Sequence, residues 1–213
     1  TKHGFARDLE FTPEDFNGSS AMFSLTQSDY TRAMYPFDFR FTVRYTLKAD
    51  GITVTYRVRN DSDTDMPFCI GAHPAFATPG DMTGYRLQFL RKETAAVPNY
   101  NLQTGLHEEH NRRELMNDST DLQLSHEMFY EDVCYFDKVN SRQVELLNSE
   151  NVGVRVDFPD FTSLGIWQAK DAPFLCIEPW YGRCDAVDFE GSLAERPYEN
   201  ALAAGGSFDA EYA

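Results

Sequence analysis

The sequence predicts an all-β protein, an antiparallel sandwich or barrel built from many short strands. Residues 39–47 and 52–60 alternate apolar and polar side chains, as half-buried strands do. Further short apolar runs follow along the chain and are separated by residues typical of turns. The sequence has no regular alternation of strands with long helices, which would indicate a parallel sheet. Antiparallel sheets are therefore expected.

The first two strands form a predicted hairpin. The run 39–47 leads into Lys48-Ala49-Asp50-Gly51, and an Asp-Gly pair is a strong signal for a tight turn between antiparallel strands. The alternation resumes at Ile52 and continues to Asn60. Both strands are expected to be half buried.

The remaining predicted elements are short. Apolar runs predict strands at 68–70, 85–89, 133–136, 143–147, 152–158, 164–168 and 174–177. Two stretches, 125–130 and 188–194, favour a helical turn or two. The strongly polar stretch 107–121 is predicted to be an exposed loop.

Length and charge limit the possible functions. A chain of 213 residues suits one domain, and we expect a single domain over 1–213. Acidic residues number 34 and basic residues 19, which gives a formal net charge of −15. This charge repels nucleic acid and anionic membranes, so neither is expected as a partner. The sequence also contains no apolar run long enough to span a membrane.

Cysteine usage indicates a reducing compartment. Cys69, Cys134, Cys176 and Cys184 include no closely spaced pair, and three of them lie in apolar runs. Buried thiols are therefore expected rather than disulfides or a zinc site. We expect a cytoplasmic location on this basis.

Glu178 is the first candidate for chemistry. It follows the apolar run 174–177 and precedes Pro179 and Gly182, so it is expected where a buried strand meets a loop. Burying a carboxylate is costly unless the group is paired or functional. Two interpretations remain open: an ion pair with a nearby arginine such as Arg183, or a general base in a pocket walled by aromatic side chains.

His73 is the second candidate. It lies between Gly71 and Pro74 at the end of a short apolar strand, where small residues let a ligand approach the backbone. Such a position presents the imidazole, although a single histidine there is more often a structural, hydrogen-bonded residue. Together with Glu178 it would supply an acid–base pair if the sheet brings both residues to one face.

Two further stretches contain histidine. Residues 107–110 read His-Glu-Glu-His and resemble a metal-binding pattern, but no apolar helical face holds two ligands in register, so no metal is expected there. Residues 2–8 would ordinarily be a frayed polar terminus. Because Phe5 and Ala6 would be poor choices for a solvated tail, this stretch is also a candidate for a site.

Three stretches carry a family resemblance. They are residues 3–7 (His-Gly-Phe-Ala-Arg), residues 70–76 (Ile-Gly-Ala-His-Pro-Ala-Phe) and residues 176–182 (Cys-Ile-Glu-Pro-Trp-Tyr-Gly), with Asp185 following. In residue type and order they resemble the aldose 1-epimerase (galactose mutarotase-like) superfamily, and within it the LacX-like and hexose-6-phosphate epimerase-like branch. The resemblance spans nearly the whole chain. It implies a large antiparallel β-sandwich, the supersandwich, with a sugar bound on one concave sheet.

The resemblance also implies an activity. His73 matches the catalytic general acid of the family, and Glu178 matches its general base. The implied reaction interconverts the α and β anomers of a hexose or hexose phosphate. A proton is placed on the ring oxygen, another is taken from the C1 hydroxyl, the ring opens, C1–C2 rotates and the ring closes on its other face. This chemistry requires no cofactor and no metal.

Residues expected to bind the sugar come from the same resemblance. His3 and Arg7 match a pair that contacts the sugar, and Asp132 matches an acidic residue that contacts its hydroxyls. Trp167 and Trp180 would form apolar walls for the pyranose ring. The expected partner is thus a small-molecule sugar.

Three other functions fit parts of the sequence. A non-catalytic carbohydrate-binding module would keep the aromatic walls without needing both His73 and Glu178. A glycoside hydrolase would need two carboxylates about 5–10 Å apart, and only Glu178 is convincingly placed. An interaction or structural domain would show no effect of sugar on its melting temperature.

The stretch 3–7 is unusual for the start of a chain. In the resembling family it is preceded by several strands that include a further sugar-contacting arginine. The resemblance therefore implies that N-terminal strands of the complete protein lie upstream of Thr1. Because missing edge strands expose unpaired backbone groups, we expect that the isolated chain can form a homodimer that covers them.

Overall fold

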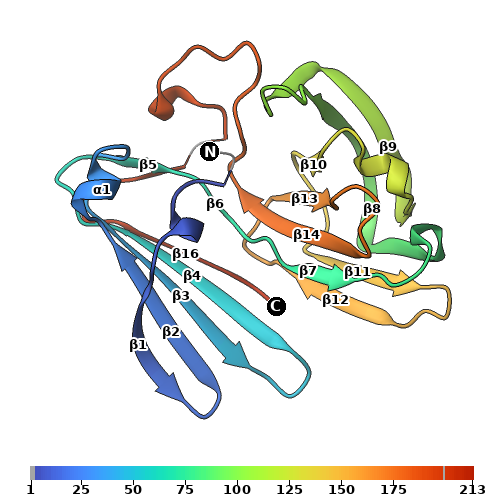
Figure 1. The fold of residues 1–213 in the computed structure, drawn as a ribbon, viewed down its shortest axis with the longest axis horizontal. Coiled ribbons are helices and arrows are strands. Elements are labelled where there is room, and N and C mark those ends of the chain that lie inside the picture. The colour runs from blue at the N-terminus through green and yellow to red at the C-terminus, as the bar shows by residue number, and fades with distance from the viewer. Residues whose placement is uncertain (1–2, 199) are drawn as a thin grey trace. The chain divides into compact units, whose positions relative to one another are not determined.

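Antiparallel strands dominate the structure (Figure 1). The computed structural model describes residues 3–198 and 200–213. Strands account for 52% of the chain and helical turns for 8%, so the predicted all-β class is confirmed. Within the described residues no helix is long and apolar enough to cross a membrane.

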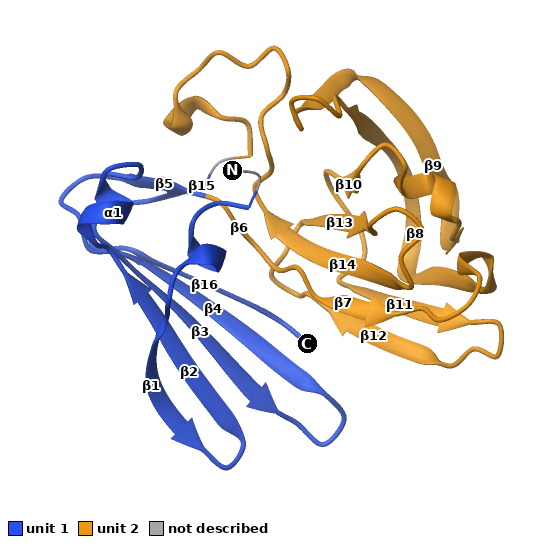
Figure 2. Cartoon of the chain, viewed as in Figure 1, with its two compact units in different colours: residues 1–68, 199–213 blue, residues 69–198 orange. Residues whose placement is uncertain are grey.

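The chain divides into two compact units (Figure 2). Among the described residues, unit 1 comprises 3–68 and 200–213, and unit 2 comprises 69–198. Beside this division, the expectation of a single domain over 1–213 stays a prediction.

Unit 1 contains a five-stranded sheet in the order β1-β2-β3-β4-β16 and a two-stranded sheet of β5 and β15. Its elements are η1 (Ala6–Asp8), β1 (Thr12–Asn17), β2 (Ser20–Thr26), α1 (Asp29–Arg32), β3 (Phe39–Leu47), β4 (Ile52–Asn60), β5 (Met66–Phe68), β15 (Asn200–Leu202) and β16 (Ser207–Tyr212). The predicted hairpin is confirmed with its predicted bounds, since β3 and β4 pair from Phe39 opposite Asn60 to Leu47 opposite Ile52.

Unit 2 contains the remaining strands. Its elements are β6 (Ile70–Gly71), β7 (Ala75–Ala77), η2 (Met82–Gly84), β8 (Tyr85–Tyr100), β9 (His107–Gln123), η3 (His126–Phe129), β10 (Cys134–Phe136), β11 (Gln143–Asn148), β12 (Gly153–Asp157), β13 (Ser163–Trp167), β14 (Phe174–Tyr181) and η4 (Leu193–Glu195). One sheet has the order β10-β13-β14-β6, with β7 also paired to β14. The other has the order β12-β11-β8-β9.

The prediction of an exposed loop over 107–121 is wrong, because these residues form most of strand β9. This strand is the last of its sheet and pairs with β8, and the register between the two shifts at several points. Ion pairs hold its polar side chains: Arg112 pairs with both Glu109 and Asp137. The register shifts and the polar edge together remove the apolar alternation by which a strand is recognised.

The sheet that contains β14 has two chemically different faces. Leu164, Ile166, Leu175 and Ile177 are completely buried on one face, where β13 and β14 pair with Ile166 opposite Ile177. Phe136 of β10 shares this face, and its ring contacts Phe89 of β8 in the other sheet, with centroids 5.7 Å apart. Because strand side chains alternate, residues 165, 167, 176, 178 and 180 lie on the opposite face.

Strand β14 is longer than predicted. It continues through Pro179 to Tyr181, so Glu178 lies within the strand and not at its end. Pro179 pairs with Leu164 on one side. On its other side the Pro179 carbonyl accepts a hydrogen bond from the N–H of Ala72, between β6 and β7, and proline has no N–H to return a second ladder bond.

The cysteines differ in exposure. Cys134 and Cys176 are buried and Cys184 is half buried, as expected for structural thiols. Cys69 is exposed, so its predicted burial is wrong. It lies at the junction between β5 and β6 and not inside a strand.

Candidate active site

Strand register places His73 opposite Glu178. Strand β6 pairs with β14 through Gly71 opposite Trp180, and β7 pairs with the same edge through Ala75 opposite Cys176. The residues between β6 and β7 keep this register, because the N–H of Ala72 donates to the Pro179 carbonyl at 2.9 Å and that of Ile177 to the Pro74 carbonyl at 3.2 Å. Residues opposite each other in an antiparallel pair project to the same face.

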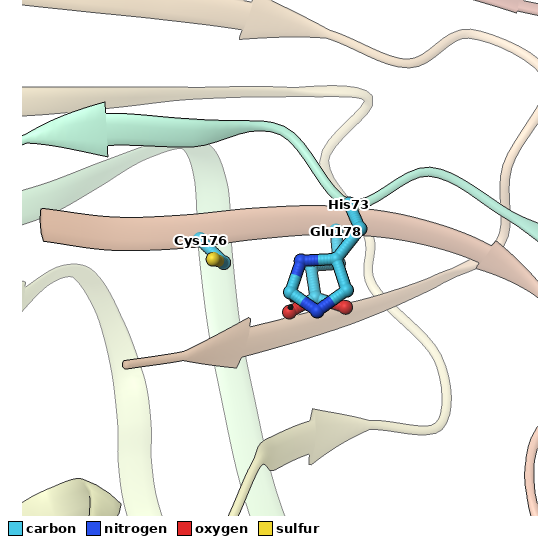
Figure 3. A group of neighbouring side chains, drawn as sticks. All are labelled: His73, Cys176 and Glu178. Carbon is cyan, nitrogen blue, oxygen red and sulfur yellow. Dashed lines mark ion pairs between the residues drawn. The ribbon is translucent and has the colours of Figure 1, made fainter. Parts of the chain in front are cut away.

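The two side chains meet on this face (Figure 3). His73 Nδ1 lies 3.4 Å from Glu178 Oε1, somewhat longer than a normal N–H···O hydrogen bond. The Glu178 side chain is 4% exposed and that of His73 is 39% exposed. The pair thus joins a carboxyl group held in the sheet to an imidazole that a ligand can reach.

Burial controls the protonation of Glu178. Loss of solvent raises the pKa of this carboxyl, the negative charge of Asp132 raises it further, and a hydrogen bond from Trp180 lowers it, with a net value of about 8. The indole Nε1–H of Trp180 donates to Glu178 Oε2 at 3.2 Å. Glu178 is therefore mainly protonated at neutral pH, whereas an ordinary glutamate is ionised.

The alternative interpretation of Glu178 as the ion-pair partner of Arg183 is wrong. Arg183 Nη2 lies 2.9 Å from Glu109 Oε2, and its Nη1 lies 3.2 Å from Asp137 Oδ1. The guanidinium also lies over the ring of Tyr198, 4.2 Å from its centroid. Arg183 follows β14 by two residues, so sequence proximity to Glu178 did not indicate spatial pairing.

Trp180 is held closely against the sheet. Its ring stacks on Tyr135 with centroids 5.3 Å apart. A Cβ atom at Gly71 would lie 2.6 Å from Trp180 Cδ1, and one at Gly165 would lie 2.9 Å from Trp180 Cζ2. Two glycines on neighbouring strands therefore leave the space that the indole occupies. On the other side of the pair, Trp167 meets the His73 ring edge-on at 5.7 Å.

Asp132 has an unusual backbone conformation near the site. Its φ of +77° lies in the left-handed region, which is uncommon for residues other than glycine. It follows η3 closely, and its Oδ1 accepts a hydrogen bond from the N–H of Val133 at 2.9 Å. Because its charge raises the pKa of Glu178, Asp132 is electrostatically coupled to the pair.

His3 and Arg7 belong to unit 1 and are exposed there. Arg7 Nε lies 3.4 Å from Asp8 Oδ1. The ring of Phe5, between them in the sequence, packs 5.7 Å from the rings of both Tyr35 and Phe39, as its apolar character suggested. The structure thus brings together the predicted site residues of unit 2, and a sugar contact by His3 and Arg7 stays a prediction.

Cys176 also lies beside the pair, and it is not among the site residues predicted from the sequence. It precedes Glu178 by two positions on β14, so its side chain lies on the same face (Figure 3). Donor atoms of His73, Cys176 and Glu178 all lie within 4.8 Å of one another. The available signal in the sequence is that Cys176 and Glu178 are two positions apart in a predicted strand, which places both side chains on one face.

The His-Glu-Glu-His stretch contributes to a different pocket of unit 2. His107 is buried, and its Nε2 lies 2.8 Å from Glu109 Oε2. Burial and the charge of Arg183 lower the pKa of His107. These side chains and Cys184 line a pocket of about 410 Å³. The stretch therefore forms part of a local hydrogen-bonded network.

Comparison with known proteins identifies relatives of this chain. The family model described as Aldose 1-epimerase matches residues 1–192. Protein LacX of Lactococcus lactis subsp. lactis, in chromosomal and plasmid forms, is 33% identical over 203 residues. Each match covers 92% of this chain and 68% of the relative.

Solved structures share the fold. A galactose mutarotase related enzyme from Lactobacillus acidophilus matches with a TM-score of 0.88 and 29% identity, over 98% of this chain and 71% of that one. A galactose mutarotase-like protein from Lactobacillus casei matches with a TM-score of 0.90 and 24% identity, over 98% and 74% of the two chains. The predicted β-sandwich of the galactose mutarotase type is thereby confirmed.

Proposed function

The chain belongs to the aldose 1-epimerase family, and we propose that it interconverts the α and β anomers of a hexose or hexose phosphate. The observation that carries this proposal is the 3.4 Å contact between His73 Nδ1 and Glu178 Oε1. Adjacent acid and base groups can act on two oxygens bonded to one carbon. C1 of a cyclic sugar carries two such oxygens, the ring oxygen and the anomeric hydroxyl.

The reaction needs one mobile proton on the pair. In the productive arrangement His73 carries it and gives it to the ring oxygen, while the Glu178 carboxylate takes a proton from the C1 hydroxyl. The C1–O5 bond breaks and C1 becomes an aldehyde carbon. After rotation about C1–C2 the ring recloses, the two groups exchange roles, and the pair regains its starting protonation.

The raised pKa of Glu178 is compatible with this cycle. A base with a pKa near the working pH both accepts a proton and releases it readily, which an ordinary glutamate does poorly. A pair that holds one proton in total is the active form. Activity is therefore expected to fall at alkaline pH, above about 8, as Glu178 and His73 lose that last proton.

The surroundings of the pair support a sugar as the ligand. Trp167 and Trp180 flank His73 and Glu178 and offer apolar surface to the C–H groups of a pyranose. Asp132 offers a carboxylate to sugar hydroxyls. Contacts from His3 and Arg7 are proposed from the family resemblance.

The direct test is anomer exchange. Freshly dissolved α-glucose, α-galactose and α-glucose 6-phosphate are followed by polarimetry or NMR with and without the protein. Glu178→Gln and His73→Ala should each lower kcat by about two orders of magnitude or more, with unchanged far-UV circular dichroism. Saturable sugar binding without exchange would instead identify a non-catalytic carbohydrate-binding protein.

A further inference from the structure

We propose that His73, Cys176 and Glu178 bind a thiophilic divalent cation such as Zn²⁺, which blocks the acid–base pair. The binding part of this proposal stands on the geometry of the three side chains alone. The blocking part rests on the proposed function. The cation would be an inhibitor and not a cofactor, because the proposed anomer exchange needs no metal ion.

The fold places all three donors on one face. Cys176 and Glu178 are two residues apart on β14, and His73 lies opposite Glu178. Among the residues that the structure describes, these form the group of three His, Cys, Asp or Glu donors close enough to share a metal ion. Chain spacing relates Cys176 to Glu178 but not to His73, since about a hundred positions separate the imidazole from the other two donors.

The distances suit a small tetrahedral ion. Zinc bonds of roughly 2.0–2.3 Å place neighbouring ligand atoms about 3.5 Å apart. His73 Nδ1 and Glu178 Oε1 are already 3.4 Å apart. All three donors lie within 4.8 Å of one another, so a shift of about 1 Å in the thiol would complete three corners of the tetrahedron.

The donor set selects the class of cation. Imidazole nitrogen, thiolate sulfur and carboxylate oxygen together suit zinc and similar borderline ions, whereas Mg²⁺ and Ca²⁺ prefer oxygen ligands only. A bound zinc ion deprotonates a coordinating thiol outright, so burial of Cys176 does not prevent binding. His73 is 39% exposed, which leaves a route for the ion to enter and a fourth position for water.

Binding can be tested without any activity. Cobalt(II) is added to the metal-free, reduced protein, and absorption in the near ultraviolet reports a cobalt–thiolate bond. The wild type and the control Cys69→Ser, which changes an exposed cysteine, should both develop this band. Cys176→Ser and Cys176→Ala should lack it while keeping a cooperative melting transition in the absence of metal. Absence of the band in the wild type, or its persistence in both Cys176 variants, would overturn the site.

Blocking is tested in the anomer-exchange assay. Zinc should inhibit the wild type, a chelator should restore the rate, and added sugar should oppose inhibition. The inhibition of Cys176→Ser by zinc is measured relative to the rate of that variant without zinc. This inhibition should require at least about tenfold more zinc, since even the loss of a residue that only supports a ligand costs 10–100-fold in metal affinity.

The outcomes separate the two proposals. A cobalt–thiolate band in a protein that exchanges no anomers would refute the proposed function and leave the metal site intact. Exchange that zinc does not slow, despite binding through Cys176, would overturn the blocking role.

Discussion

Glu178 shows how a single residue is tuned by its surroundings and not by an opposite charge. Burial raises the pKa of the carboxyl to about 8, and Asp132 acts in the same direction. His73 faces it from the segment between β6 and β7, Cys176 lies beside it on β14, and Trp180 supplies the opposing hydrogen bond. The indole N–H is thus the one contact that favours the carboxylate among the causes of this shift.

Trp180→Phe isolates that contact. The substitution keeps an aromatic ring but removes the N–H, so the pKa of Glu178 should rise above about 8 while burial and Asp132 still act. A hydrogen bond contributes about 0.5–1.5 kcal/mol, which corresponds to a shift of up to about one pKa unit. The alkaline limb of the kcat/KM profile should move to higher pH by that amount.

The matched control is Trp167→Phe, because the Trp167 ring contacts His73 and its N–H is not a donor to Glu178. The alkaline limb of the kcat/KM profile of Trp167→Phe should stay at the wild-type pH. If Trp180→Phe also left the limb unmoved, the hydrogen bond would have no influence on the ionisation of the pair.

At the scale of strands, the site depends on small residues beside a large one. Gly165 lies opposite Glu178 on β13, and Gly71 lies opposite Trp180 on β6. Neither position has room for a side chain, because the indole of Trp180 occupies the space above both. The two neighbouring strands therefore determine where the hydrogen-bond donor of Glu178 lies.

Gly165→Ala should displace that indole. The new Cβ atom would lie 2.9 Å from Trp180 Cζ2 and 3.2 Å from Val133 Cγ2, so one of them must move. Overpacking of this kind costs about 1–3 kcal/mol. We expect a lower denaturation midpoint, altered tryptophan fluorescence and slower anomer exchange.

Gly84→Ala provides the comparison within the same unit, because a Cβ atom at Gly84 has open space around it. Its stability and rate should match the wild type. Equal behaviour of both alanine variants would show that the indole does not need the space above Gly165.

Strands with a regular alternation of buried and exposed side chains could be predicted from the sequence, and strands without it could not. The hairpin of β3 and β4 was predicted to the residue because each strand buries one face and an Asp-Gly turn joins them. Strand β9 was missed because its ion-paired, bulged edge hides the alternation. His73 and Glu178 were recognisable as candidates from their positions in the sequence, but the register that makes them neighbours depends on strand pairing, which local sequence does not reveal.

At the scale of the whole molecule, the raised pKa of Glu178 makes the stability of the fold depend on pH. A carboxyl group with a pKa of about 8 in the folded chain and about 4.5 in the unfolded chain binds its proton more tightly when folded. Between these two values the folded state holds a proton that the unfolded state has released. The free energy of unfolding therefore falls as pH rises through this window, and the stabilising contribution is complete only below about pH 4.5.

Glu178→Gln should remove this dependence. The variant should resemble the wild type in stability near pH 4.5 and exceed it at pH 8 and above, by on the order of 3–5 kcal/mol. Denaturant unfolding of both proteins at several pH values measures the difference. Glu150→Gln, a change at an exposed glutamate, should show the wild-type pH dependence. Parallel curves for Glu178→Gln and the wild type would mean that Glu178 ionises equally in both states.

The interruption between β6 and β7 has a consequence for how this protein can evolve. Pairing is anchored at Gly71 and again at Ala75, and the register is continuous across the three residues between them. One inserted or deleted residue would put the two anchors out of step and turn the imidazole to the opposite face of the sheet. The length of this segment is therefore constrained as well as the identity of His73. The number of residues between the two anchors, and not only the contact itself, keeps His73 opposite Glu178.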